Sequence, residues 1–265
     1  MNILEQLAEH ARFRTEEAKK VFPFAAIRSM AEQLPKNPGR FASALSREGI
    51  SFICECKKAS PSKGLIAADF PYLHIAKDYE AAGADAISVL TEPKWFLGSD
   101  EYLRKIAAQV SIPCLRKDFT VDPYMIYEAK LLGASAVLLI VSILDEARIR
   151  EYLSVCDALG LDALTEAHDE AEIETALRAG ARIIGVNNRN LKDFTVDTSN
   201  SRKLREMVPR DVLFVSESGV RTAEDVEALR RSGVDAVLVG ETLMKASDRK
   251  AKLAELRGTS ERQIP

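Results

Sequence analysis

The stretch Leu-Gly-Ala-Ser-Ala-Val-Leu-Leu-Ile at residues 132–140 decides the fold, because it joins the end of a helix directly to a buried strand. Its glycine is the residue type that most easily takes the left-handed conformation in which helices often end. The unbroken apolar run that follows is typical of a parallel strand covered on both faces. This segment therefore predicts a helix that ends near residue 132 and a strand that begins a few residues later.

The same arrangement recurs at residues 82–90, 179–186 and 232–240. Four further apolar runs fit between these copies, and together they predict eight strands: 52–57, 85–90, 113–117, 136–140, 162–166, 182–187, 212–217 and 236–240. Most neighbouring strands begin roughly 25–30 residues apart, the length of one strand–helix unit. Eight such units predict an α/β protein with a single closed (β/α)8 barrel, the TIM barrel, rather than an open sheet.

The residues before the first predicted strand form a separate part of the pattern. Helical segments there are interrupted at Pro35-Lys36-Asn37-Pro38-Gly39. We predict that residues 1–48 are a short N-terminal helical extension covering one barrel end, and that residues 49–265 are the barrel. The chain of 265 residues then makes one domain overall, since a single barrel needs about 250 residues.

Composition narrows the class of partner. With 37 Lys and Arg against 40 Asp and Glu, the formal net charge is −3, so we expect neither nucleic acid nor a membrane as partner. The N-terminus predicts an amphipathic helix rather than a signal peptide, and the longest apolar run, 136–141, is too short to span a bilayer. These features predict a cytoplasmic protein.

Cysteine and histidine patterns predict no metal site. Cys54, Cys56, Cys114 and Cys156 are expected to be buried free thiols in a reducing compartment. The three histidines, His10, His74 and His168, show no ligand spacing.

Polar residues stand at the carboxyl ends of most predicted strands, where a barrel of this type holds its active site. Alternation along the first strand places Glu55 and Lys57 on the same, inward face. The other ends supply Lys117, Glu166, Asn187, Arg189, Glu217, Ser218 and Glu241. Converging charges are costly unless they are paired or used, so these residues predict either structural ion pairs or a catalytic mouth.

Other polar and aromatic residues near the strand ends have ordinary explanations. Arg116 and Lys58 alternate outward and are expected to be solvated surface. Trp95 is expected to pack within its loop rather than stack on a ligand. His168 follows Glu166 by two residues, but we expect it to begin the next helix rather than to act as a second base.

Small residues after the last two strands predict a phosphate site. Ser218-Gly219-Val220 and Gly240-Glu241-Thr242 allow backbone N–H groups and a helix N-terminus to face an anion. These two loops are the usual phosphate site of such barrels. Residues 60–64, Ser-Pro-Ser-Lys-Gly, add a basic, hydroxyl-rich loop that could serve as a lid.

Several of these segments resemble indole-3-glycerol phosphate synthase, and the resemblance runs from Ile3 to about Met244. The segments that carry it are ECKKASPSKG (55–64), LTE (90–92), GS (98–99), LRKDF (115–119), TE (165–166), GVNNRNL (185–191), SESG (216–219) and GETLM (240–244). The resemblance implies ring closure, decarboxylation and dehydration of 1-(2-carboxyphenylamino)-1-deoxyribulose 5-phosphate. It implies no cofactor, because nothing is oxidised in this reaction.

The resemblance also implies roles for individual residues. Lys117 matches the general acid that protonates the ribulose carbonyl, and Glu166 matches the base of the dehydration. Lys57 matches a residue that pairs with the substrate carboxylate or donates a later proton, and Glu55 would orient the lysines. Asn187 and Ser218 would hold substrate hydroxyls. The implied binding residues for substrate and phosphate are Ser60, Arg189, Glu217, Gly219, Gly240 and Glu241.

Two rival interpretations stay open from the sequence. A Schiff-base aldolase could use Lys117 or Lys57 as nucleophile on a similar phosphate-binding barrel. A non-catalytic binder of phosphorylated ligands is the other, although it would have little reason to keep Glu55, Lys57, Lys117 and Glu166 together. The substrate is expected to be a small phosphorylated molecule, and the protein a monomer or weak homo-oligomer.

Overall fold

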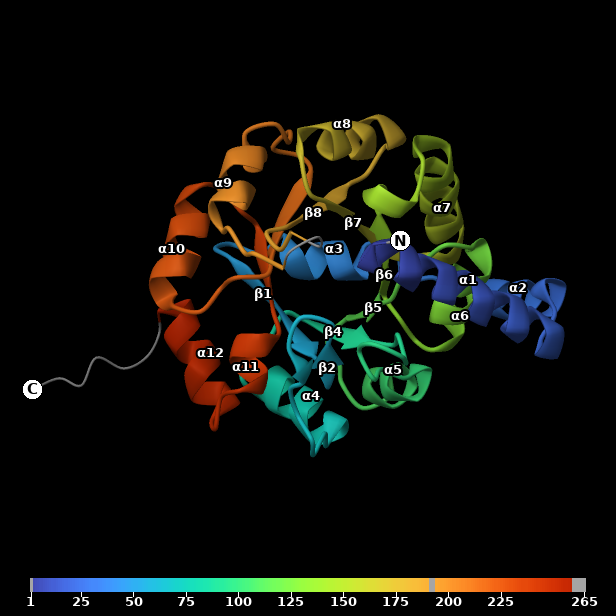
Figure 1. Cartoon of the computed structure of the whole chain (residues 1–265), viewed down its shortest axis with the longest axis horizontal. Coiled ribbons are helices and arrows are strands. Elements are labelled where there is room, and N and C mark those ends of the chain that lie inside the picture. The colour runs from blue at the N-terminus through green and yellow to red at the C-terminus, as the bar shows by residue number, and fades with distance from the viewer. Residues whose placement is uncertain (1, 191–193, 259–265) are drawn as a thin grey trace, which may run out of the picture.

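Eight parallel strands form a closed barrel in the computed structural model, which describes residues 2–190 and 194–258 (Figure 1). Their order around the barrel is β1-β10-β9-β8-β7-β6-β5-β4. The strands are β1 (Ser51–Cys56), β4 (Ala86–Leu90), β5 (Cys114–Lys117), β6 (Ala136–Ile140), β7 (Asp162–Ala167), β8 (Ile183–Asn187), β9 (Leu213–Glu217) and β10 (Ala236–Val239). The predicted TIM barrel is confirmed, and each strand begins and ends within one residue of its predicted bounds. Leu191 of the quoted motif and residues 259–265 lie outside the described residues.

Helices follow the strands along the chain and surround the barrel, and the final two come after the last strand. They are α4 (Tyr72–Ala81), α5 (Asp100–Ala107), α6 (Pro123–Leu131), α7 (Glu146–Leu159), α8 (Glu170–Ala179), α9 (Ser199–Arg205), α10 (Ala223–Arg231), α11 (Glu241–Met244) and α12 (Arg249–Arg257), with a 3₁₀ turn η1 (Val141–Ile143) after β6. Thr222 and Asp225 form a capping box at the start of α10. Gly133 has a φ of 86° after α6, so the glycine of the repeat takes the left-handed conformation that its position predicted.

The inward residues of the strands explain why the polar side chains meet at one end. Each strand contributes a buried apolar residue to the barrel interior: Ile53, Ala86, Leu115, Leu138, Leu164, Ile183, Val215 and Ala236. Side chains of a strand alternate between its faces, so the residue two positions further on also points inward. Glu55, Lys117, Glu166 and Glu217 each stand two residues after one of these positions. The four side chains therefore converge one layer above the apolar core.

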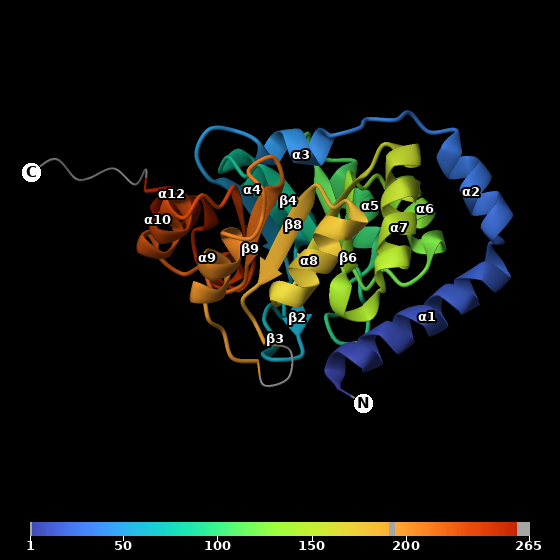
Figure 2. The same cartoon turned by 90° about the horizontal axis from the view of Figure 1, so that it is seen from above.

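The N-terminal helices α1 (Ile3–Val21), α2 (Phe24–Glu32) and α3 (Arg40–Leu45) reach both ends of the barrel (Figure 2). Leu7 of α1 packs on the interior core from the mouth. At the opposite end, the backbone N–H groups of Phe41 and Ala42 donate to the carboxylate of Asp162 at 2.9 and 3.0 Å. The extension thus differs from the expected cap over one end, because α1 and α3 cover different ends.

Arg116 corrects one sequence-based expectation. It points outward as predicted, but its side chain is only 2% exposed because α5 and α6 cover it. Its guanidinium donates to Asp100 at 2.8 Å, to Glu128 at 2.6 Å and to the Met125 carbonyl at 2.9 Å. The prediction of solvated surface was wrong, since the outward face of a barrel strand lies beneath helices.

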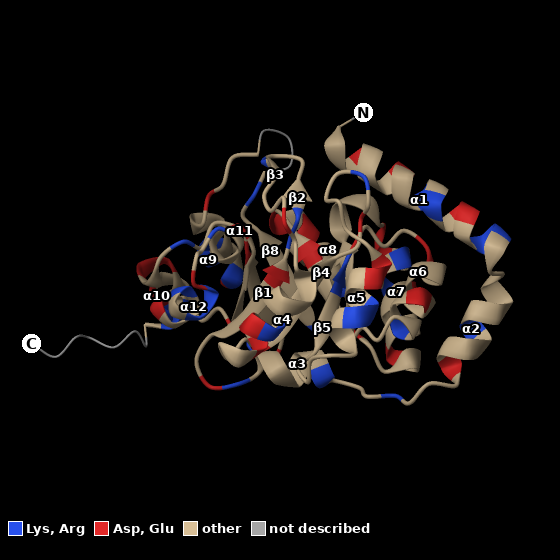
Figure 3. Ribbon diagram, turned by 90° about the horizontal axis from the view of Figure 1, so that it is seen from below, with Lys and Arg blue, Asp and Glu red and all other residues tan. Residues whose placement is uncertain are grey.

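The surface and the cysteines follow ordinary patterns. Lys, Arg, Asp and Glu residues of both signs are mixed along α1 and the peripheral helices (Figure 3). No helix within the described ranges combines the length and apolar character needed to cross a membrane. Cys54, Cys56, Cys114 and Cys156 are free and buried, as expected.

Candidate active site

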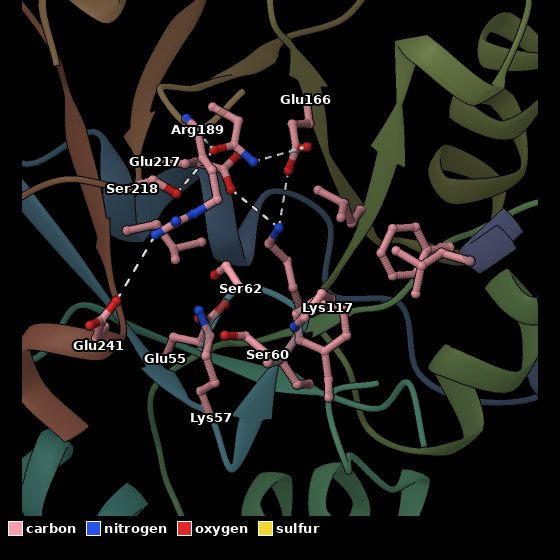
Figure 4. A pocket seen from close by; sticks show the side chains of 18 of the residues that line it. Glu55, Lys57, Ser60, Ser62, Lys117, Glu166, Arg189, Glu217, Ser218 and Glu241 are labelled. Carbon is pink, nitrogen blue, oxygen red and sulfur yellow. Dashed lines mark hydrogen bonds and ion pairs between the residues drawn. The ribbon is translucent and has the colours of Figure 1, made fainter. Parts of the chain in front are cut away.

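Lys117 is the centre of a buried ion cluster at the floor of the barrel mouth (Figure 4). Its ammonium donates to the Glu166 carboxylate at 3.0 Å and lies 3.3 Å from that of Glu217. The side chains of Glu166 and Glu217 are 3% and 2% exposed. The cluster therefore holds one ammonium between two carboxylates, almost out of contact with water.

The pKa values in this cluster follow from burial and from the neighbouring charges. Burial would lower the pKa of Lys117, but Glu166, Glu217 and Glu55 outweigh it and raise that pKa above its ordinary value. Burial would raise the pKa of Glu166, yet Lys117 and then His168 hold it below its ordinary value. Burial raises the pKa of Glu217 to about 7 against the opposing effect of Lys117. Lys117 and Glu166 thus favour their charged forms, and Glu217 titrates near neutral pH.

Asn187, at the end of β8, is fixed by three hydrogen bonds. Its amide nitrogen donates to Glu166 at 3.3 Å, and its amide oxygen accepts from the Ser218 hydroxyl at 3.0 Å and from the Arg189 N–H at 3.1 Å. Ser218 has a φ of 68°, an uncommon value for serine that often marks a functional position. The amide is therefore held so that Asn187 connects Glu166 with Ser218.

Glu55 and Lys57 form a second ion pair beside the cluster. The Lys57 ammonium lies 2.5 Å from Glu55, whose other oxygen accepts from the Ser88 hydroxyl at 3.4 Å. After them, the predicted lid forms a small antiparallel hairpin of β2 (Ala59–Ser60) and β3 (Gly64–Leu65). Ser60 at its base lines the same cavity as Lys57 and Lys117.

The predicted phosphate-binding loops line a second cavity, which adjoins the main one. Gly219, Gly240 and Glu241 line it, and it shares Lys57, Arg189 and Ser218 with the main cavity. Gly219 has a φ of 97° and Gly240 directly precedes α11. Burial would raise the pKa of Glu241, but Lys245, whose ammonium donates to it at 2.7 Å, lowers it. Glu217 does not line this cavity, so the structure places it with Lys117 instead.

The sequence did not predict the apolar wall of the main cavity. It includes Ile3, Leu7, Leu90, Phe96, Phe119, Leu138, Ile140 and Phe194. Ile3 and Leu7 come from α1, whose docking over the mouth has no local signal in the sequence. Trp95 packs edge-on against His10, as expected of a loop residue, and does not line this cavity. The cavity is thus apolar on one side and charged at its floor.

His168 lies closer to the cluster than the sequence suggested. It precedes α8, but its imidazole Nε2 is 3.5 Å from Glu166 Oε1. The sequence contained a signal for this position. His168 follows Leu164 by four residues and Glu166 by two, so the alternation of the strand points all three side chains inward. Within the described ranges, no group of three or more His, Cys, Asp or Glu side chains is arranged to hold a metal ion.

Gly185 makes room for Glu217 inside the barrel. A Cβ at this position would lie 2.2 Å from Glu217 Oε1 and 3.1 Å from the nearest Leu164 carbon. In Gly185→Ala we expect the carboxylate to swing away from Lys117, because it is the flexible end of its side chain. We predict about a tenfold loss of kcat while the free energy of unfolding falls by only about 1 kcal/mol. Steady-state kinetics and urea unfolding measure the two quantities.

The control for this prediction is Gly185→Ala combined with Glu217→Ala. Since the second substitution removes the clashing group, the two changes should be non-additive in kcat. If the effects of the two substitutions on log kcat were fully additive, the added methyl group would lower kcat by a mechanism other than displacement of Glu217.

Comparison with known proteins identifies the family of this chain. The indole-3-glycerol phosphate synthase family model matches residues 4–256. The chain is 58% identical to the indole-3-glycerol phosphate synthase of Ruminiclostridium cellulolyticum, over 97% of this chain and 100% of that protein. It is 49% identical to that of Lachnoclostridium phytofermentans, over 96% of this chain and 98% of that protein.

Solved structures with lower identity support the fold alone. A 3-hexulose-6-phosphate synthase superposes with a TM-score of 0.65 at 16% identity, covering 80% of this chain and 100% of that chain. A thiamine phosphate pyrophosphorylase from Pyrococcus furiosus gives 0.59 at 18% identity, covering 83% of this chain and 100% of that one. The family match extends along nearly the whole chain, and this chain belongs to the indole-3-glycerol phosphate synthase family, the carboxy-lyases that form the indole ring in tryptophan biosynthesis.

Proposed function

We propose that Lys117 is the general acid and Glu166 the general base with which this barrel converts 1-(2-carboxyphenylamino)-1-deoxyribulose 5-phosphate to indole-3-glycerol phosphate. The observation that carries this assignment is the 3.0 Å contact between the two groups at the floor of the cavity. An acid and a base held side by side can serve successive steps on one bound substrate.

The first step is attack of the anthranilate ring carbon on the ribulose carbonyl. The carbonyl oxygen becomes an alkoxide, a much stronger base than a carboxylate, so even a strongly held ammonium gives up its proton to it. Lys117 supplies that proton. The apolar wall formed by Phe96 and Phe119 suits the aromatic ring, and Lys57 suits its carboxylate until CO2 leaves.

Dehydration then completes the indole ring. Glu166 removes a proton from the former ribulose C1, the CH2 group next to the nitrogen, as the hydroxyl leaves the neighbouring C2. Lys57 protonates that hydroxyl so that it departs as water. Glu55 orients Lys57 through their ion pair. Asn187 and Ser218 hold substrate hydroxyls, while Asn187 also holds one oxygen of Glu166.

The phosphate occupies the adjoining cavity. Arg189 and the backbone of Gly219, Gly240 and Glu241 bind it there, and Ser60 approaches it from the main cavity. Glu217 lies against Lys117 and would repel an anion, so we assign it to the support of the acid rather than to phosphate. This changes the binding role that the sequence suggested for Glu217.

Schiff-base chemistry at Lys117 is disfavoured by its charge. An amine must be neutral to attack a carbonyl. Because Glu166 and Glu217 raise the pKa of Lys117, the ammonium form persists at neutral pH. We further propose that the protein works in the cytoplasm as a monomer or weak homo-oligomer, without nucleic acid or membrane.

The test is a fluorescence assay for the indole product, with the carboxyphenylamino sugar phosphate as substrate. We expect turnover without added metal or redox cofactor, and no covalent lysine adduct after borohydride treatment with substrate bound. A trapped adduct at Lys117 or Lys57 would instead support the aldolase interpretation.

A further inference from the structure

His168 connects the catalytic cluster with a neighbouring surface cavity. This cavity adjoins the active-site cavity, with which it shares Asn187 and Arg189. His168 lines it and is 19% exposed at the side chain, whereas Glu166 is nearly sealed from water. The imidazole therefore stands between a buried carboxylate and solvent.

One edge of the His168 ring is fixed by α8. Its Nδ1 lies 3.1 Å from Glu172, and its backbone N–H donates to the same carboxylate oxygen at 2.8 Å. The Ser142 hydroxyl lies 3.3 Å from Nδ1. Because Glu172 is ionised and can only accept, Nδ1 must carry a proton. Glu172 thus fixes both the orientation and the tautomer of the ring.

The other edge faces the proposed base. Nε2 is buried, makes no hydrogen bond among the described residues, and lies at ion-pair distance, 3.5 Å, from Glu166 Oε1. With Nδ1 already protonated, Nε2 can donate to Glu166 only as imidazolium. A neutral ring would instead direct a lone pair at an ionised carboxylate.

The charges around His168 favour the imidazolium. Burial would lower the pKa of His168, but the hydrogen bond to Glu172 and the charges of Glu166, Glu172 and Glu217 raise it above its ordinary value. Among the described residues, Glu166 forms ion pairs with Lys117 and His168, and Glu172 forms one with His168 alone. The other charged residues that line this cavity are Glu5, Asp169, Arg189 and Asp197.

We propose that His168 is a positioning residue for the indole-forming reaction, whose imidazolium holds Glu166 Oε1 and keeps this carboxylate ionised as a base. Oε2 is then left to Lys117, so each carboxylate oxygen has its own cation. This inference rests on the proposed role of Glu166.

The test compares His168→Gln with the wild-type enzyme across pH. Loss of the cation raises the pKa of Glu166, so the base is protonated over a wider range of low pH. We expect the acidic limb of the kcat profile to move up by about one pH unit, so that kcat falls about tenfold on the acid side of the limb and changes little at neutral pH. KM should change less than twofold, since His168 does not line the substrate cavity.

Three further variants make the result specific. Glu172→Gln should shift the limb in the same direction but less, because it weakens the charge on His168. His74→Gln should leave the profile unchanged, since His74 is exposed on α4. In His168→Ala, added imidazole should restore part of kcat through the surface cavity, which a purely structural role would not allow.

The outcomes separate this inference from the proposed function. If Glu166→Gln keeps full activity, the assignment of the base fails. If Glu166→Gln is inactive but His168→Gln keeps the wild-type pH profile and kcat, only the role of His168 is overturned. A loss of kcat that is equal at every pH and not rescued by imidazole would also overturn it.

Discussion

Replacing Lys117 with alanine is expected to lower kcat/KM for indole-3-glycerol phosphate formation at least about 100-fold, in line with the loss of a general acid. Lys117 is the ammonium that touches both Glu166 and Glu217, and its removal leaves the carbonyl oxygen without a proton donor in this assignment. The fluorescence assay for product measures the effect. Lys203→Ala is the matched control, because Lys203 is 71% exposed and pairs only at the surface, with Glu170.

The fold should survive this substitution, but its stability should become sensitive to pH. Without Lys117, the pKa values of the buried Glu166 and Glu217 rise above those of the unfolded chain. Groups whose pKa is raised by folding destabilise the native state as pH increases through the raised values. The unfolding free energy of Lys117→Ala should therefore fall, relative to wild type, between about pH 5 and pH 8. A variant with near wild-type turnover would contradict the acid role, whatever its stability.

Replacing Glu166 with glutamine is expected to stop the reaction after decarboxylation. Glutamine keeps the size of the side chain and its contact with Asn187, but it cannot take a proton. Ring closure and loss of CO2 use Lys117 and should continue for one turnover, while product formation falls at least about 100-fold. Rapid-quench mass spectrometry should then reveal an intermediate that is heavier than the product by one water molecule.

The control for this prediction is Glu174→Gln on the exposed face of α8, where the carboxylate is 62% exposed. It should show wild-type kinetics and no accumulated intermediate. If Glu166→Gln blocks CO2 release together with product formation, the carboxylate acts before dehydration and the division between acid and base is wrong.

The sequence predicted the barrel well because its signals are local and repeated. The repeat around Gly133 marks a helix end and a strand start within a few residues, and alternation carries Glu55, Lys117, Glu166 and Glu217 to the same inner layer. Alternation alone misplaced Arg116, because it gives the direction of a side chain but not what covers it. The same rule would have placed His168 inward had it been applied past the end of β7.

Other parts of the site depend on contacts that no local pattern records. The apolar wall from Ile3 and Leu7 requires α1 to lie across the mouth, and the space for Glu217 depends on the missing side chain of Gly185. The hairpin at Ser60 and Gly64 is too short to show strand periodicity. These features arise from tertiary packing between segments that are distant in the chain.

The position of α1 has a consequence for the order of events during synthesis. Arg14 of α1 donates to Asp118 at 2.7 Å, across a sequence separation of 104 residues. At typical translation rates the helix leaves the ribosome roughly 5–20 seconds before this partner exists. Throughout that interval Leu4, Leu7 and Ala11 have no barrel to pack against. The Asn2–Glu5 capping box and the Lys19–Glu16 pair are local, so they can stabilise the helix before it docks.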